Sequence, residues 1–191
     1  MKTKILFFSI LFFTACLLDL HAQGLTPPSE GKAVVYFTRV TKFGFAVSFE
    51  YFHNDKFIGV FKGQNYMRYE VDPGEHLFWV STEDKEFVTA DLKAGGVYII
   101  IINVEMGVVK ARVGLNPITV ADAELFERAK ELIEKKAPVV TSEEVIKKTT
   151  AKLEKKNFIP EKLDLYERVW KKEKNFPHIS PDMAIPADQL D

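Results

Sequence analysis

Apolar and polar side chains alternate with a period of two along much of residues 33–114, a pattern typical of β-strands that bury one face. The segment VSFEYFH, from Val47 to His53, places Val, Phe and Tyr on one side and Ser and Glu on the other. Turn residues separate such runs, as in Asp72-Pro73-Gly74, where proline followed by glycine suits a type II turn. The pattern predicts eight strands, at about 33–39, 47–53, 57–61, 66–71, 76–82, 86–92, 97–104 and 108–114.

The run VYIIII, from Val97 to Ile102, has no polar side. It predicts a central strand that is covered on both faces. Beyond Pro117 the apolar spacing becomes helical, and residues 119–136 predict an amphipathic helix. We expect this helix to cover the outer face of that strand.

Two further helices are predicted downstream. Thr141-Ser142-Glu143-Glu144 has the pattern of a capping box and predicts a helix that runs to about Lys156. Pro160 opens a third predicted helix that ends near Lys174. From Phe176 onward, three prolines and the lack of periodicity predict a tail without fixed structure.

Together these elements predict a mainly β fold. We expect an antiparallel β-sandwich of seven to eight strands, of the immunoglobulin or prealbumin kind, with a C-terminal α-helical extension. The expected organisation is a signal peptide at 1–22, a β-sandwich domain at 23–117, a helical extension at 118–175 and a disordered tail at 176–191.

The N-terminal segment has the layout of a secretory signal peptide. Lys2 and Lys4 precede an apolar run from Ile5 to Leu18, and the small-residue ending Leu20-His21-Ala22 predicts cleavage after Ala22. The run is shorter than the ~20 residues that span a bilayer, so we expect no transmembrane helix in the mature chain. The protein is therefore expected to be exported, to the periplasm or the outer membrane.

The cysteine of the chain, Cys16, lies inside this segment, in the context Phe-Thr-Ala-Cys, which weakly resembles the acylation site of bacterial lipoproteins. A lipid anchor at Cys16 is thus the alternative to cleavage after Ala22. Cleavage after Ala22 leaves no cysteine for disulfides, thiolate catalysis or metal binding.

The 26 basic and 27 acidic residues nearly balance, which favours neither nucleic acid nor an anionic membrane as a partner.

Four segments carry a resemblance to known families: GKAVVYFTR, VSFEYFHNDKFIGVFKGQNYMRYEV, VDPGEH and DLKAGGVYI. Residues 31–104 resemble a family of exported bacterial proteins known as domain of unknown function 2846. VDPGEH and LKAGGVY are also similar to small PEGA-type β-domains, which carry a proline-glycine-glutamate turn before a strand. Both resemblances imply an all-β sandwich, and neither implies catalytic residues. The part from Thr119 onward lies outside them.

Candidate catalytic and metal-binding groups lack the spacing that such sites need. His53, His76 and His178 form no HExxH or HxH motif, so we expect no metal site and no cofactor. The serines show no nucleophile elbow. We expect a non-enzymatic protein without catalytic residues.

The enzymatic alternative is a hydrolase acting on envelope polymers, which requires two carboxylates to converge in a pocket. Its candidates are Glu70, Asp72, Glu83 and Asp84.

Phe43 and Phe45 flank Gly44 in the connection between the first two predicted strands, where loops are normally polar. They form either a lid on the core of the sandwich or an exposed contact for a partner. The lid is the expected arrangement, because apolar loop residues usually close the end of a core. With Tyr66 they are the candidate ligand-binding residues, and a carbohydrate-binding module would need at least two of the three rings exposed.

Tyr166 and Trp170 share one face of the third predicted helix. They are candidate partner-docking residues, provided that this helix is free of the sandwich. We therefore expect a non-enzymatic envelope protein, a binding or structural module whose partner is an envelope protein or a glycan. A carbohydrate-binding module is the alternative function.

Overall fold

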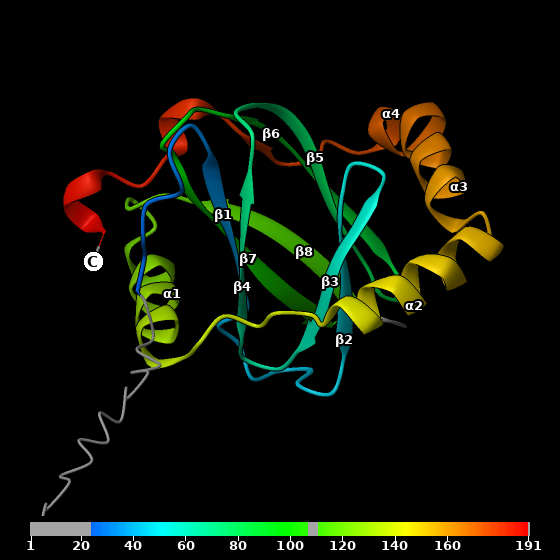
Figure 1. The fold of residues 1–191 in the computed structure, drawn as a ribbon, viewed down its shortest axis with the longest axis horizontal. Helices are drawn as coiled ribbons and strands as arrows, with labels where there is room; N and C mark the ends of the chain where they lie inside the picture. The colour runs from blue at the N-terminus through cyan, green and yellow to red at the C-terminus, as the bar shows by residue number, and fades with distance from the viewer. Residues whose placement is uncertain (1–23, 107–110, 191) are drawn as a thin grey trace, which may run out of the picture.

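The computed structural model describes residues 24–106 and 111–190, so the expected signal peptide and Cys16 lie outside the described residues (Figure 1). The described chain is mainly β, with two sheets and a few helices. The strands are β1 (Ala33–Thr38), β2 (Ser48–His53), β3 (Lys56–Lys62), β4 (Tyr66–Val71), β5 (Gly74–Ser81), β6 (Lys85–Leu92), β7 (Val97–Met106), β8 (Ala111–Ile118) and β9 (His178–Ile179). The helices are α1 (Ala123–Lys135), α2 (Glu143–Lys155), α3 (Phe158–Leu165), the π-helical turn η1 (Tyr166–Trp170), α4 (Lys171–Glu173) and the 3₁₀ turns η2 (Pro181–Met183) and η3 (Ala187–Gln189).

Both sheets are mixed. One has the strand order β4-β1-β7-β8 and the other β3-β2-β5-β6-β9. The pairs β1–β7 and β6–β9 are parallel, whereas the other pairs are antiparallel. The predicted antiparallel arrangement of seven to eight strands is corrected on both counts, because the described residues form nine strands and two parallel pairs. Side-chain alternation indicates which face of a strand is buried, but it does not specify the partner strand.

The two sheets share an apolar cluster that lies between them. The ring of Phe37, on β1, lies 5.6 Å from the Tyr51 ring and 5.5 Å from the Phe78 ring, both of the other sheet, in edge-on contacts. Tyr51 in turn stacks on Phe61 with 4.5 Å between ring centroids. Rings of this size dominate core energetics, each contributing roughly 1.5–3 kcal/mol through burial.

Strand β7 is buried on both faces, as predicted. Ile100 faces the cluster between the sheets, while Ile99 and Ile101 face α1. The helix buries Phe126, Ala129 and Ile133 against this outer face. Figure 1 shows α1 beside β1, β4 and β7. The structure therefore confirms that the first predicted helix covers the central strand.

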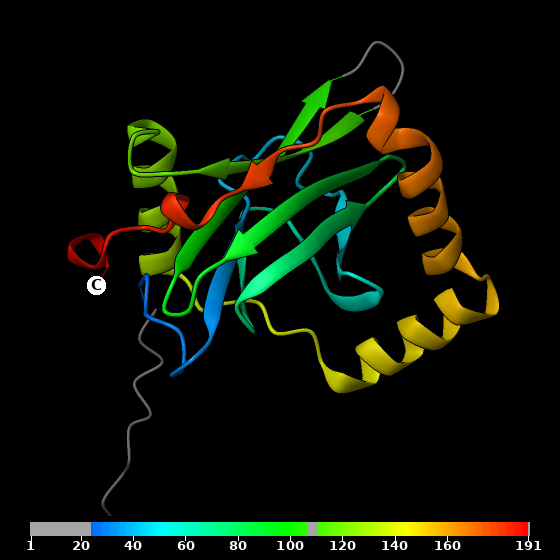
Figure 2. The ribbon, with the colours of Figure 1, turned by 90° about the horizontal axis from the view of Figure 1, so that it is seen from above.

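The helices α2 and α3 and the turn η1 pack on the outer face of the other sheet. Trp79 of β5 stacks on Phe52 at 3.8 Å and on Phe87 at 5.5 Å between ring centroids. Leu153 of α2 and Ile159 of α3 are buried in the same cluster. Figure 2 shows α2, α3 and α4 following one another along one side of the sheets. None of the helices in residues 24–106 and 111–190 has the length and apolar character needed to cross a membrane.

Helix α1 begins four residues after the predicted start at Thr119, and the starts of α2 and α3 differ from the predictions by one or two residues. The N-cap of α2 is Ser142, whose hydroxyl accepts the N–H of Val145, while the hydroxyl of Thr141 accepts the N–H of Val60 at 3.0 Å. Thr141 therefore ties the start of α2 to β3. Helix α3 begins at Phe158, so Pro160 lies within its first turn, where its missing N–H has no helical acceptor in any case.

The C-terminal segment is a correction to the predicted tail without fixed structure. Residues 176–190 cross back from α4 to the side of α1 (Figure 2). β9 pairs with β6, and the N–H of Ile185 donates to Val97 O at 2.8 Å. Ile179 and Ile185 are both buried. The prolines interrupt any regular period, but two buried isoleucines and these backbone bonds hold the segment against both sheets.

A chain that ends at Pro177 is expected to lose about 2 kcal/mol of unfolding free energy, because two buried isoleucines contribute roughly 1.5–3 kcal/mol each and the released chain regains entropy. Chemical denaturation measures the change. A chain that ends at Pro186 is the control, since it keeps Ile179 and Ile185 and should remain near the full-length value. Equal midpoints for all three chains would contradict a stabilising tail.

Candidate functional site

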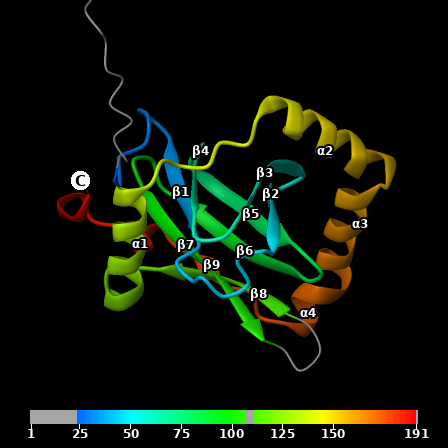
Figure 3. The ribbon, with the colours of Figure 1, turned by 90° about the horizontal axis from the view of Figure 1, so that it is seen from below.

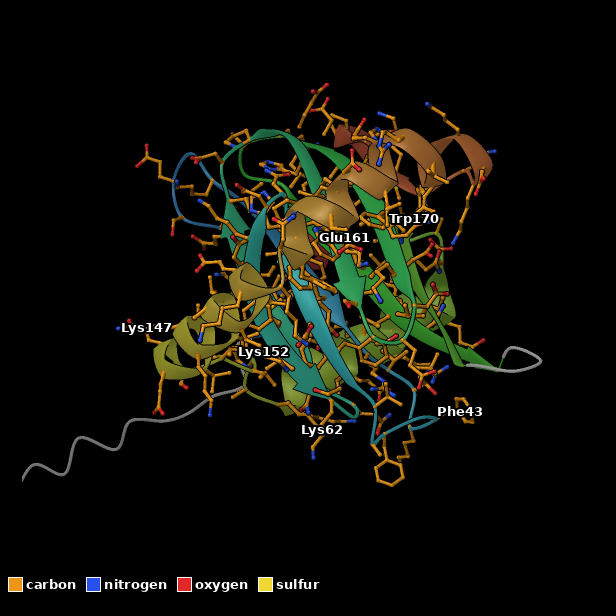
Figure 4. The ribbon with its side chains drawn as sticks, turned by 90° about the vertical axis from the view of Figure 1, so that its right-hand side faces the viewer. Phe43, Lys62, Lys147, Lys152, Glu161 and Trp170 are labelled. Carbon is orange, nitrogen blue, oxygen red and sulfur yellow. The ribbon has the colours of Figure 1, made fainter. Side chains whose placement is uncertain are left out.

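Phe43 and Phe45 project from the connection between β1 and β2, at one end of the sheets. Their exposed fractions are 48% and 71%. Figure 4 shows Phe43 at the end of the molecule far from Trp170, and Figure 3 views the β1–β2 connection from below. The expectation that these rings form a lid on the core is wrong, because their faces are open to solvent instead of packed inward. Both rings are exposed, as the alternative of a contact for a partner requires.

The buried side chain of Arg39 holds this loop from inside. Its Nη1 donates to Val47 O at 3.0 Å, and its Nη2 donates to Phe43 O at 2.8 Å and to Gly44 O at 2.5 Å. The guanidinium carbon also lies 4.7 Å from the centroid of the Phe49 ring. One side chain therefore fixes three carbonyl groups of a single short loop. The sequence alone does not single out Arg39, because an arginine that follows a strand is usually solvent-exposed.

Gly44 lies beside the same guanidinium group. Its φ of +65° is in the left-handed region, and a Cβ there would lie 3.2 Å from both Arg39 Nη2 and Val104 Cγ1. Glycine therefore lets the loop approach the guanidinium while it turns the flanking phenylalanines outward. The backbone of Val47 closes the turn by donating its N–H to Gly44 O at 2.9 Å.

Lysines border the two phenylalanines. Lys42 precedes them in the loop and is exposed, and Lys62, at the end of β3, is exposed as well. A Cβ on the next residue, Gly63, would lie 3.8 Å from Phe45 O, so the β3–β4 turn adjoins the loop. Figure 4 shows Lys62 at the same end of the molecule as Phe43. The exposed rings are thus flanked by positive charge.

Tyr66, the third candidate for ligand binding, does not join them. It is buried, its ring lies 6.0 Å from that of Tyr36, and its hydroxyl donates to Lys136 O at 3.0 Å. The chain that follows α1 covers this ring. Tyr66 is therefore a structural residue.

Tyr166 and Trp170 are likewise corrected as docking residues. The ring of Tyr166 stacks on Phe87 with 4.5 Å between centroids, and that of Trp170 lies 5.7 Å from Phe87. Their helix is not free of the sheet. These two aromatics hold it in place instead of facing a partner.

Two histidines that are remote in sequence meet at the other end of β2. His53 ends β2 and His76 lies near the start of β5, and the register pairs His53 with Phe78. His53 Nε2 and His76 Nδ1 are 2.8 Å apart, and His53 Nδ1 is 3.2 Å from the hydroxyl of Tyr69. In the sequence these histidines look isolated, because they form no motif. Only the adjacency of β2 and β5 brings them together.

The hydrogen bonds define the tautomers. His76 Nε2 must donate to Asp72 O, 2.8 Å away, since a carbonyl can only accept. When His76 is neutral, its Nδ1 is the acceptor, so His53 Nε2 donates to it and Tyr69 donates to His53 Nδ1. Burial, followed by the charge of His76, lowers the pKa of His53 to about 4.

The low pKa of His53 makes stability depend on pH. An unfolded histidine titrates near 6.5, so between about pH 6.5 and 4 the unfolded chain binds more protons and the unfolding free energy falls as the pH falls. After solvent screening for a half-buried ring, we expect a loss of about 1–2 kcal/mol. Urea titrations at several pH values, with EDTA present to exclude metal ions, measure it.

His53→Gln should flatten this pH dependence, whereas His178→Gln, at an exposed histidine, should leave it unchanged. An identical pH dependence in the wild type and His53→Gln would contradict the assignment to His53.

The four carboxylates of the hydrolase alternative do not converge. Asp72 pairs with Lys32 at 2.8 Å, while Glu83 and Asp84 lie in the turn at the opposite end of β5. A hydrogen bond from Ser29 lowers the pKa of Glu70, and one from Lys32 lowers the pKa of Asp72. A general acid requires a raised pKa, so this geometry provides no acid–base pair of the kind that the alternative needs.

Within the described residues, no group of three or more His, Cys, Asp or Glu side chains is arranged to hold a metal ion. No family model matches the chain, and no curated protein or solved structure matches it significantly. The resemblance to exported β-domains therefore stays an expectation from the sequence.

Proposed function

We propose that this chain is an exported, non-enzymatic binding module of the cell envelope that docks a partner protein through Phe43 and Phe45. The observation that carries the proposal is the exposure of both rings on a loop whose backbone is fixed by the buried Arg39. A loop that is already ordered loses little conformational entropy on binding, so more of the free energy of apolar contact is available as affinity.

A protein partner suits these side chains better than a glycan. The two exposed rings meet the minimum that a carbohydrate-binding module needs. Phenyl rings offer apolar surface without a hydrogen-bonding group, however, and Tyr66, the one candidate ring with a hydroxyl, is buried. The exposed Lys42 and Lys62 place charge around an apolar centre, which is the anatomy of a protein interface. They favour a partner whose apolar pocket has an acidic rim. Two phenylalanines supply about 3–6 kcal/mol, which corresponds to a weak, transient complex.

The same proposal includes export with cleavage after Ala22. This cleavage would keep Leu25, which is fully buried in the cluster that α1 covers. We also propose that the two sheets form a β-sandwich of the immunoglobulin or prealbumin kind. Mass spectrometry of the protein isolated from its host should find Gln23 as the first residue. An acylated Cys16 as the first residue would instead show that the chain is processed as a lipoprotein.

The binding test compares two double variants. Phe43→Ser with Phe45→Ser removes the proposed contact, while Val140→Ser with Val145→Ser removes valines that are 84% and 40% exposed elsewhere on the surface. Both should unfold near the wild-type midpoint, since exposed substitutions cost about 0.5 kcal/mol or less. Immobilised wild type and the valine variant should retain the same envelope protein, and the phenylalanine variant should retain at least about tenfold less.

Retention of that protein by the phenylalanine variant would place the contact elsewhere and overturn the proposal. The same variants are tested on purified envelope polysaccharide and on lipid vesicles. Binding to either that depends on Phe43 and Phe45, without a protein partner, would assign the loop to a different class of ligand.

A further inference from the structure

The histidine pair has the geometry of two metal ligands. His53 Nε2 and His76 Nδ1 face each other at 2.8 Å on neighbouring strands. Imidazole nitrogens bind divalent transition metals at about 2.0–2.1 Å, so two nitrogens on adjacent corners of one ion stand roughly 3 Å apart. The observed spacing is close to that value, but in the hydrogen bond the two nitrogens point at each other. To admit an ion, each ring must turn until both nitrogen lone pairs point at the same position.

The outer nitrogen of His76 is already held in the way that a metal-bound histidine requires, and that of His53 lies beside a hydroxyl that can accept its N–H after a change of tautomer. His76 Nε2 donates to Asp72 O, and His53 Nδ1 lies against the hydroxyl of Tyr69. Such contacts from behind orient an imidazole and settle which nitrogen faces the metal. We propose that His53 and His76 form a two-histidine site for a divalent transition-metal ion of the Cu²⁺, Ni²⁺ and Zn²⁺ class.

Binding needs one change of tautomer and no redox step. In the metal-free pair His53 Nε2 carries the proton that it donates to His76. When the ion binds, that proton leaves Nε2 to solvent and another is taken up at Nδ1, which then donates a hydrogen bond to the hydroxyl oxygen of Tyr69. The net charge of the two rings stays zero. The ion replaces the hydrogen bond between them.

The surroundings set the strength of this site. The charge of Lys56 lowers the pKa of His53 and that of Asp55 raises it. Lys32 forms an ion pair with Asp72. Among the described residues there is no third His, Cys, Asp or Glu ligand, which separates this site from a four-ligand structural zinc site. Water fills the other positions. We therefore expect an exchangeable ion in the micromolar range, with Cu²⁺ bound more tightly than Ni²⁺ or Zn²⁺.

The test titrates the untagged, EDTA-stripped chain with Cu²⁺ against glycine as a competing chelator. One ion per chain is expected, with an electron paramagnetic resonance spectrum that shows two nitrogen ligands. His53→Gln and His76→Gln should each weaken binding at least about tenfold. His178→Gln is the matched control and should bind like the wild type, because His178 is exposed and hydrogen-bonded to Thr89 Oγ1 instead.

Several outcomes would overturn the site: no binding, one-to-one binding that survives both His53→Gln and His76→Gln, or loss of binding in His178→Gln. Because a variant can bind poorly through misfolding, nuclear magnetic resonance of the wild type gives a second criterion. Cu²⁺ should broaden the ring signals of Tyr69 and Phe78 before those of Trp170. Broadening centred on other residues would contradict the assignment. Neither readout depends on the Phe43–Phe45 contact, so this inference and the proposed function can fail separately.

Discussion

Replacement of Trp79 by alanine is expected to lower the free energy of unfolding by about 3–5 kcal/mol. The indole ring lies 3.8 Å from Phe52 and 5.5 Å from Phe87, and its N–H donates to Asn54 O at 2.9 Å. It is fully buried beneath the helices, so the smaller side chain leaves a cavity that the surrounding rings cannot fill. The loss should be concentrated in the helical layer, because α2, α3 and η1 pack on this cluster.

Denaturant titration gives the size of the Trp79→Ala effect, and amide hydrogen exchange gives its location. Exchange in α2 and α3 should accelerate more than exchange in β7, which is buried between α1 and the other sheet. Trp79→Phe is the control and should lose less than the alanine variant, because it keeps a stacking ring. Uniform acceleration across β7 and the helices would show that the helices do not unfold as a separate layer.

Replacement of Arg39 by methionine is expected to cost about 2–4 kcal/mol and to loosen the Phe43–Phe45 loop. The carbonyl groups of Phe43, Gly44 and Val47 lose the guanidinium as donor, at roughly 1–3 kcal/mol for each that stays unsatisfied. Gly44 O keeps the N–H of Val47 as a donor. Part of this cost is offset, because methionine does not have to be desolvated as a cation. Burial lowers the pKa of the Arg39 guanidinium, in line with that desolvation.

Denaturant titration and hydrogen exchange at the Val47 amide test the clamp, since that amide donates to Gly44 O within the loop. Arg168→Met is the control. Arg168 pairs with Asp164 on an exposed helix face and should contribute under about 1 kcal/mol. Unchanged exchange at Val47 in Arg39→Met would contradict the role given to the guanidinium, whatever the change in stability.

Much of the fold follows from local pattern. Alternation located the eight longer strands to within a few residues, and the all-apolar VYIIII run indicated a strand with cover on both faces. What local pattern lacks is long-range pairing. Nothing around Val34 or Val97 shows that β1 and β7 pair in parallel, since side chains that alternate correctly fit either direction. The tail was missed because Ile179 and Ile185, separated by Pro181, share no period.

In the candidate sites, too, local pattern identified some residues, whereas those that depend on long-range contacts were missed or misplaced. Phe43 and Phe45 were identifiable because two phenylalanines in a short loop are unusual, although their exposure could be known only from the structure. Arg39 was not identifiable, since its three acceptors are backbone oxygens, which carry no residue signature. His53 and His76 are joined only by the pairing of β2 with β5. Tyr66 was assigned to the wrong environment, because its cover comes from the chain near Lys136, far away in sequence.

The central claim is that the Phe43–Phe45 loop, held by Arg39, is the contact surface of this protein. Photo-crosslinking in living cells tests it most directly, with benzoylphenylalanine placed at position 45 and, as the matched control, at position 140, where Val140 is 84% exposed. The account predicts one discrete protein adduct from position 45, little from position 140, and loss of the adduct when Arg39 is replaced by methionine. The same adducts from both positions, or none from position 45, would contradict it.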